Sequence, residues 1–317
     1  IGGGDGGDLI TIGTGAYSAI GGGAGLDTIV FSGGTIATGA SVGLGQGNDV
    51  LSAAASQLTT LTAAGIFGGG GADTITIDTL SNTGSFINGD STADGGEADS
   101  ITVAALTEDT LVRGKGGADT ISVANLGTGA FIAGNAGGDV ISVDGADADF
   151  AIRGGQGGDS ISFDGVASTV TGNIIGGGGS DTIVIAESGQ IEFDLVTIDA
   201  GAGVDSISFT GAITTNSDLG TLEISNMGDS KVGAMDTIDV SGLANDATIA
   251  IDFAASTALS LPSAAAFSAI GTVNATETAP TIGFTTAVGQ SGAVAAGIMS
   301  FSGQASASVA TAATYAD

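Results

Sequence analysis

The fold is decided by the stretch GGGGADTITI, residues 68–77, in which a glycine-rich turn ends in Asp73 and leads into alternating apolar and polar residues. Clear copies read GGDGGDLITI (3–12), GGAGLDTIVF (22–31), GGQGGDSISF (154–163) and GGGGSDTIVI (176–185). Weaker copies read LGQGNDVLSA (44–53), GKGGADTISV (114–123), GNAGGDVISV (134–143) and AGAGVDSISF (200–209). Self-similarity at a period of about 20 residues is typical of a repeat architecture.

Every turn ends in an aspartate. These aspartates, 19 to 26 residues apart, are Asp8, Asp27, Asp49, Asp73, Asp99, Asp119, Asp139, Asp159, Asp181 and Asp205. Asp236 starts a last, degenerate copy, because MDTIDV keeps the strand pattern but has lost the glycine turn.

A second apolar position is locked to the aspartate of each unit. Seven residues before it stand Ile20, Val42, Ile66, Val112, Ile132, Ile152, Ile174 and Ile198. Two and four residues after it stand apolar pairs such as Ile75 and Ile77, which alternate with Thr or Ser as in a strand with one buried face. A unit therefore holds two short strands and two turns, of which one is constant and one varies in length.

One such unit cannot bury its apolar face alone, whereas stacked units bury it between them. The pattern predicts an all-β fold: a parallel β-solenoid of about eleven two-strand rungs over residues 1–253. Residues 254–317 are rich in Ala, Ser and Thr and contain both prolines. We expect this β-rich C-terminal segment to be a cap, a docking segment or the start of a second domain. The chain opens inside a repeat, so we expect it to be a piece of a longer protein.

Composition excludes several classes of function. The chain carries 34 Asp and Glu against 4 Lys and Arg, a formal charge of −30, so it has no basic surface for a nucleic acid. It has no Cys and no His, which excludes disulfides, thiol nucleophiles, the usual triads and the commonest zinc ligand. No run of 18 apolar residues is present, so we expect no membrane insertion.

The aspartate column predicts bound cations. A turn aspartate often bonds its own backbone, but that does not explain ten of them in one column, where carboxylates ~5 Å apart would repel one another. Glycines allow the backbone to turn carbonyl oxygens inward, and the carboxylates add hard anionic oxygens. Calcium takes six to eight such oxygens, more than one turn can supply, so two stacked turns would share each ion.

The motif G-G-x-G-x-D-x-U-x, where U is apolar, resembles the nonapeptide of the RTX calcium-binding β-roll family. The resemblance covers roughly residues 1–210 and implies Ca²⁺ ions between consecutive turns. The implied ligands are the ten aspartates and the glycine carbonyls before them, among them Gly3, Gly22, Gly68, Gly154 and Gly176.

The chain also departs from this pattern. Only one side keeps the nonapeptide, so one column of ions is expected. Lys115 and Asn135 replace glycines, which predicts weaker sites there. The acidic residues Asp90, Asp94, Glu97 and Asp99 form either a distorted or extra site or a solvated acidic loop.

Low Lys, absent Cys and abundant Ala, Gly, Thr and Ser make the chain similar to bacterial RTX-type surface-layer proteins. This resemblance implies a secreted, extracellular structural protein that self-associates into a lattice or fibril, with cell-surface polysaccharide as a further partner. The alternative is an extender segment of a large RTX adhesin or surface fibril.

Two further classes are less favoured. Ice binding would need Thr along the turns, where none occurs. A polysaccharide-active solenoid would need a basic catalytic residue, and Arg113 and Arg153 are better interpreted as charge compensation, because both stand six residues before their aspartates. We expect no enzyme.

Overall fold

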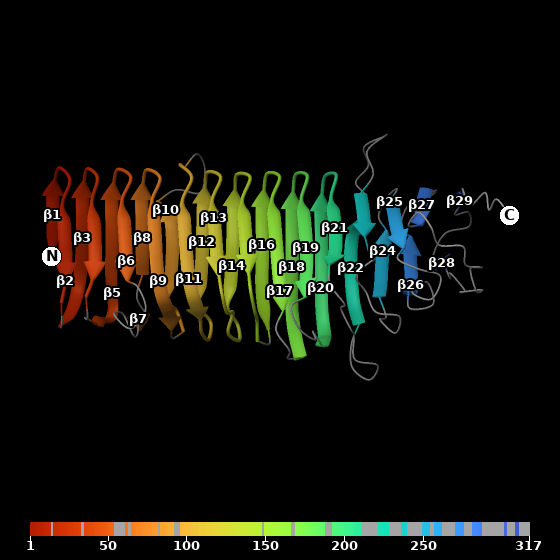
Figure 1. Ribbon diagram of the computed structural model, residues 1–317, viewed down its shortest axis with the longest axis horizontal. Coiled ribbons are helices and arrows are strands. Elements are labelled where there is room, and N and C mark those ends of the chain that lie inside the picture. Colours follow the sequence, from red (N-terminus) through yellow and green to blue (C-terminus); the bar gives the residue numbers. More distant parts are fainter. Residues whose placement is uncertain are drawn as a thin grey trace. The chain divides into compact units, whose positions relative to one another are not determined.

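A computed structural model describes residues 1–13, 15–32, 35–53, 61–62, 65–81, 83–91, 96–147, 149–165, 169–187, 192–210, 221–227, 236–239, 249–253, 257–261, 270–275, 281–286, 301–302 and 308–310. The chain divides into two compact units, Ile1–Ser160 (unit 1) and Ile161–Asp317 (unit 2). All regular elements in the described ranges are strands (Figure 1). No helix there has the length and apolar character needed to cross a membrane.

Two parallel sheets form unit 1. The first contains β1 (Gly2–Asp5), β3 (Ala16–Ala24), β5 (Thr35–Gln46), β8 (Gly65–Gly70), β10 (Phe86–Asp90), β12 (Leu111–Gly116), β14 (Phe131–Ala136) and β16 (Phe150–Gln156). The second contains β2 (Leu9–Ile12), β4 (Thr28–Phe31), β6 (Val50–Ala53), β7 (Leu61–Thr62), β9 (Thr74–Ser81), β11 (Ser100–Leu106), β13 (Thr120–Val123) and β15 (Val140–Val143). The tight turns that lead from the first sheet into the second lie along one edge, at the top of Figure 1.

Strand pairing follows the sequence repeat. Each strand pairs in parallel with its counterpart in the neighbouring unit, so that Ile101 of β11 lies opposite Ile121 of β13, which lies opposite Ile141 of β15. The side chains of a strand alternate between its two faces, and a shift by one residue would expose this apolar set. The aligned apolar columns therefore fix the register.

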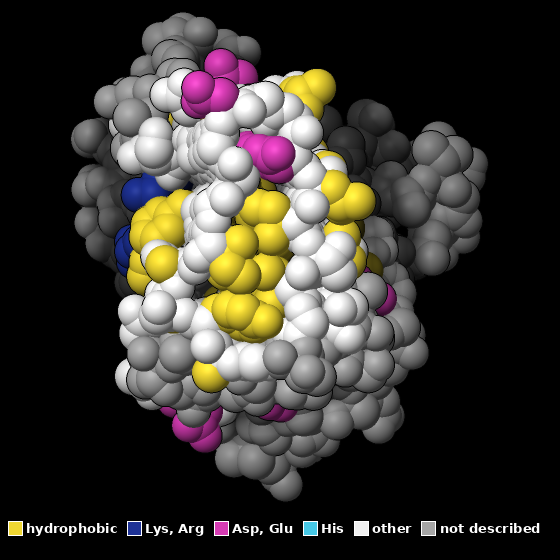
Figure 2. Space-filling view, turned by 90° about the vertical axis from the view of Figure 1, so that its left-hand side faces the viewer, with side chains coloured by type: hydrophobic (Ala, Val, Ile, Leu, Met, Phe, Trp, Pro, Cys, Tyr) yellow, Lys and Arg dark blue, Asp and Glu magenta, His cyan; other side chains and the backbone are white. Residues whose placement is uncertain are grey.

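The core lies between the two sheets. The predicted apolar residues seven before an aspartate, from Ile20 to Ile198, are 0 to 3% exposed, and so are Ile75 and Ile77 after Asp73. Viewed along the stack, hydrophobic side chains form a column between two walls (Figure 2). Aliphatic residues dominate this core, and Phe31, Phe150 and Phe163 are among its largest fully buried side chains. The predicted core positions are confirmed.

Unit 2 repeats the arrangement. One row of parallel strands contains β18 (Thr169–Gly178), β20 (Glu192–Ala202), β22 (Thr221–Met227), β24 (Ile249–Phe253), β26 (Ile270–Ala275) and β28 (Phe301–Ser302). The other contains β17 (Ser160–Gly165), whose first residue belongs to unit 1, and β19 (Thr182–Glu187), β21 (Ser206–Thr210), β23 (Asp236–Asp239), β25 (Thr257–Leu261), β27 (Thr281–Thr286) and β29 (Ser308–Ala310).

The all-β parallel solenoid predicted from the repeats is confirmed. The described residues of unit 1 alone make about eight turns, and parallel strands of the same kind follow in unit 2, so the rung count differs slightly from the about eleven expected. The repeat weakens after residue 210, where the glycine turn is lost and the described ranges become short. The boundary expected at residue 253 stays a prediction, although β25 and β27 beyond it pair in parallel as the earlier strands do.

Candidate functional site

The constant turn depends on glycines in a left-handed backbone conformation. In the turn between β8 and β9, Gly69 and Gly71 have φ of 123° and 115°, values that residues with a side chain rarely adopt. A Cβ on Gly69 would also overlap the carbonyl oxygen of Gly45 in the preceding turn. The turns therefore stack backbone on backbone, and Asp73 follows at a fixed place.

The aspartates form a hydrogen-bonded ladder along this edge. In unit 1 the backbone N–H of each donates to Oδ1 of the next, at 2.7 to 2.8 Å, from Asp8 through Asp27, Asp49, Asp73, Asp99, Asp119 and Asp139 to Asp159. In unit 2, Asp181 donates in the same way to Asp205 at 2.8 Å. One oxygen of each accepting carboxylate is thus fixed by the backbone N–H of the preceding aspartate.

The other carboxylate oxygen faces inward. Apart from Asp8, which is partly exposed, the ladder aspartates are only 1 to 2% exposed. Oδ2 is buried and accepts no hydrogen bond in Asp8, Asp27, Asp49, Asp73, Asp99, Asp119 and Asp139. A buried polar atom without a partner costs about 1–3 kcal/mol, and more when the group is charged. This cost recurs at each of these seven aspartates of unit 1.

At seven ladder aspartates Oδ2 lies against the α-carbon of a turn glycine. A Cβ on Gly3 would overlap Oδ2 of Asp8 and also the carbonyl oxygen of Gly22 in the next turn. The same arrangement pairs Gly22 with Asp27, Gly68 with Asp73, Gly89 with Asp99, Gly114 with Asp119, Gly134 with Asp139 and Gly176 with Asp181. A carboxylate oxygen and, at most of these glycines, a carbonyl oxygen of the next turn therefore converge at each step.

Burial and mutual repulsion disfavour the ionised carboxylates. Burial raises the pKa of Asp99 to about 8, and neighbouring carboxylates add to the rise. Burial likewise raises the pKa of Asp73 and of Asp119 to about 7, and it raises the pKa of Asp49 and Asp139. Two charges ~4.8 Å apart repel by about 3.5 kcal/mol at an effective dielectric constant of 20. Without a cation, the edge is favourable only when several carboxyls are protonated.

The oxygen atoms of this edge suit a hard divalent cation. Carboxylate and carbonyl oxygens are the donors that Ca²⁺ prefers. In the described ranges, no group of three or more Asp or Glu side chains could hold a metal ion by itself. Carbonyl oxygens from adjacent turns would therefore have to complete the coordination. The repeated aspartate ladder is compatible with calcium binding.

The structure brings the predicted site residues together and adds to them. The ten aspartates lie on one edge of their units, and Gly3, Gly22, Gly68 and Gly176 face the carboxylates. Gly154 contributes its carbonyl oxygen, which points at the α-carbon of Gly134. Sequence reasoning did not single out Gly89, Gly114 and Gly134, although the last two stand five residues before an aspartate, as Gly3 does. Asp94 lies outside the described residues.

Two residues with a side chain adopt the left-handed conformation at a glycine position of a described turn. Lys115 and Asn135 have φ of 94° and 82°. Asparagine tolerates the left-handed region, whereas lysine is strained there. Lys115 forms no ion pair with a described residue to offset the strain. The sequence had identified these two positions as departures, and the backbone gives the physical reason.

We expect Lys115→Gly to stabilise the folded chain by about 1 kcal/mol, because relief of left-handed strain exceeds the entropy that glycine adds to the unfolded chain. The measurement is the urea midpoint in saturating calcium. Lys115→Ala is the matched control, because it removes the charge and keeps the Cβ. If both substitutions stabilise the chain equally, charge rather than backbone strain is responsible.

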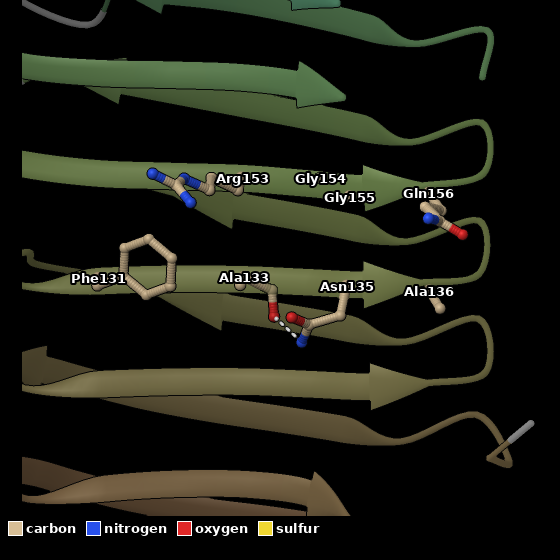
Figure 3. Close-up of a pocket in the computed structure, with 8 residues that line it drawn as sticks. All are labelled: Phe131, Ala133, Asn135, Ala136, Arg153, Gly154, Gly155 and Gln156. Carbon is tan, nitrogen blue, oxygen red and sulfur yellow. Dashed lines mark hydrogen bonds between the residues drawn. The ribbon is translucent and has the colours of Figure 1, made fainter. Parts of the chain in front are cut away.

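A shallow hollow of about 420 Å³ lies on the outward face of β14 and β16 (Figure 3). The Arg153 guanidinium lies 5.2 Å from the centre of the Phe131 ring, a cation–π distance. Arg113, Ala133 and Arg153 align across β12, β14 and β16. Basic and hydrophobic side chains thus lie side by side on this face (dark blue and yellow at the left in Figure 2). The hollow has no acidic lining residue.

Comparisons with family models, with curated proteins and with solved structures gave no match to this chain.

Proposed function

We propose that the chain is a secreted, calcium-binding structural protein that forms or contributes to a cell-surface layer, with Ca²⁺ driving its folding and assembly. The observation that carries the proposal is the column of buried aspartate Oδ2 atoms in unit 1 that accept no hydrogen bond, most of them lying against a turn glycine. A buried anionic column of this kind is stabilised by cations and by little else that the composition offers, because the chain has 4 basic residues against 34 acidic ones.

The ladder aspartates and the carbonyls of the turn glycines would hold the ions. Bound Ca²⁺ supplies positive charge that removes repulsion between stacked carboxylates. Because the site needs two stacked turns, it does not exist in the unfolded chain, and binding free energy becomes folding free energy. Extracellular calcium modules typically work at about 10⁻⁴ to 10⁻³ M. The chain would therefore fold after export, and the nonapeptide likeness to RTX β-rolls is part of this proposal.

Self-association distinguishes the surface layer from its alternative. A lattice protein forms fixed contacts between copies, with cell-surface polysaccharide as the proposed anchoring partner. An extender segment of an RTX adhesin or fibril would stay a monomeric solenoid. We favour the layer because the composition is similar to surface-layer proteins.

The test is sedimentation velocity, with circular dichroism on the same samples, as calcium is raised from chelated to millimolar. We expect a compact β-rich species to replace an expanded one, followed by large assemblies. Compaction that stops at a monomer would favour the adhesin segment. Full β-structure in chelator, unchanged by calcium, would contradict the calcium role. Magnesium at equal concentration is the control, because its smaller ion demands stricter octahedral geometry.

A further inference from the structure

One carboxylate of unit 1 stands outside the ladder and is just as deeply buried. Asp90 ends β10, is 3% exposed, and its Oδ2 accepts no hydrogen bond. In the β8–β10 pairing it lies opposite Gly69, one of the left-handed turn glycines. Asp90 itself does not have a positive φ. β10 thus ends in a carboxylate at a position where β8 has no side chain.

The chain has five extra residues to accommodate it. In regular turns the facing glycine stands five residues before the aspartate, as Gly68 does before Asp73, whereas Gly89 stands ten before Asp99. Despite this insertion, the ladder continues, because the backbone N–H of Asp73 donates to Asp99 at 2.8 Å. Asp90 is therefore an addition to the ladder and not a displaced member of it.

Oxygen atoms converge on Asp90 as they do at the ladder steps. A Cβ on Gly96 would overlap both Oδ2 of Asp90 and the carbonyl oxygen of Gly116. The backbone N–H of Gly116 is close enough to the Asp90 carboxylate to lower its pKa, against the larger rise caused by burial. Asn88, two residues earlier and thus on the same face of β10, also has a buried Oδ1 that accepts no hydrogen bond. The atoms that could bind a cation here are all hard oxygen ligands.

Several carboxylates surround Asp90, while Arg113 lies opposite Asn88 in the β10–β12 pairing. The Asp90 carboxylate is close enough to Asp73, Asp99 and Asp119 to raise the pKa of each, after the larger effect of burial. Glu97 is another close carboxylate, and its Oε2 accepts from the N–H of Gly71 at 3.3 Å. No described Lys or Arg forms an ion pair with Asp90. A mobile cation is the species that this arrangement lacks.

We propose that Asp90, with the carbonyl oxygen of Gly116, Glu97 and Asn88 around it, forms an additional site for a hard divalent cation beside the aspartate ladder. The site depends on the proposed function only in sharing the ladder's cation. Because it brings the most carboxylates together, it is the position that fills at the lowest free calcium. This proposal gives the five additional residues between Gly89 and Asp99 a role: they add metal ligands beside the aspartate ladder.

The competing state is a protonated Asp90 that donates to the Gly116 carbonyl, and the isosteric Asp90→Asn separates the two. Asparagine keeps an acceptor for the N–H of Gly116 and mimics the protonated acid. We expect Asp90→Asn to remove one ion per chain at saturation, measured as calcium content by atomic emission after equilibrium dialysis. It should also delete the tightest phase of a calcium titration. Asp144→Asn, which removes one exposed carboxylate, should leave both unchanged.

Asp90→Gly is the second variant, because it restores the residue type of Gly69 at this position and should lower the ion count in the same way. Circular dichroism at saturating calcium checks that each variant folds. An unchanged ion count in folded Asp90 variants would overturn the additional site and leave the ladder intact. A wild-type chain that takes up no calcium would overturn the proposed function and this inference together.

Discussion

Without divalent cations, the protein is expected to be most stable near pH 4 and to unfold as the pH rises to 8. Five ladder carboxyls have folded-state pKa values above the ordinary 3.8: the pKa is raised for Asp49 and Asp139 and reaches about 7 for Asp73 and Asp119 and about 8 for Asp99. At a pH between 3.8 and these raised pKa values, the folded chain binds more protons than the unfolded chain. Stability then falls with rising pH, by about 1.4 kcal/mol for each pH unit and extra proton.

Asp73, Asp99 and Asp119 each give a loss of a few kcal/mol between pH 4 and pH 8, on the order of the ~5–15 kcal/mol total stability of a typical domain when several act together. The sign is opposite to ordinary acid denaturation, in which paired carboxylates stabilise the protein at neutral pH. The measurement is thermal or urea unfolding, followed by circular dichroism, in buffers stripped of metal. Stability that stays level or rises over this range would contradict the expected burial of charge.

Asp119→Asn is the matched variant, because asparagine resembles the protonated acid and cannot ionise. It should flatten the pH dependence, whereas exposed Asp144→Asn should not. Saturating calcium should reverse the slope, because protons compete with the metal for the same oxygens. If stability depends on pH in the same way with and without calcium, then folding of the solenoid is not coupled to cation binding, and the prediction is wrong.

Much of this fold could be predicted, because one physical requirement recurs in every unit. A strand pattern such as Thr74-Ile75-Thr76-Ile77 fixes which face is buried, and its repetition fixes parallel pairing. The aspartate column follows from the same repetition. These features are local in sequence or tied to an invariant offset, so no knowledge of the rest of the chain is needed.

Other features depend on register across an insertion, which a sequence offset cannot give. The pairing of Asp90 with Gly69 shows that Asp90 occupies a turn-glycine position, and the sequence left open whether it belongs to a site or a loop. The partner of Asp99 is Gly89, ten residues away instead of five, for the same reason. The contact of Arg153 with Phe131 depends on side-chain packing between two units. The division after residue 160 is accompanied by no change in composition.

Gly69→Ala is expected to destabilise the calcium-bound chain by about 3 kcal/mol or more, because left-handed strain of about 1–2 kcal/mol adds to steric overlap of similar size. Gly69 has φ of 123°, and a Cβ there would overlap the carbonyl oxygen of Gly45. The overlapped atom is backbone, so no side chain can move aside. Relief would require the two turns to separate, which would disturb the oxygen atoms that face Asp73.

The neighbouring glycine offers a matched control. A Cβ on Gly70 would meet nothing within 4 Å, and Gly70 does not have a positive φ. Its counterpart in the preceding turn is Gln46, a residue with a long side chain. Gly70→Ala should therefore be neutral or stabilising by up to about 1 kcal/mol, because alanine lowers the entropy of the unfolded chain.

Urea midpoints at saturating calcium measure both substitutions, and the calcium midpoint of folding gives a second reading. Since binding and folding are coupled, Gly69→Ala should need more calcium to fold, while Gly70→Ala should not. Equal losses from the two variants would mean that the turn resists side chains everywhere, and equal tolerance would mean that adjacent turns do not stack backbone on backbone. The difference between the two substitutions therefore tests whether the close approach of adjacent turns depends on the missing Cβ of Gly69. The same close approach sets the place where carboxylate and carbonyl oxygens converge.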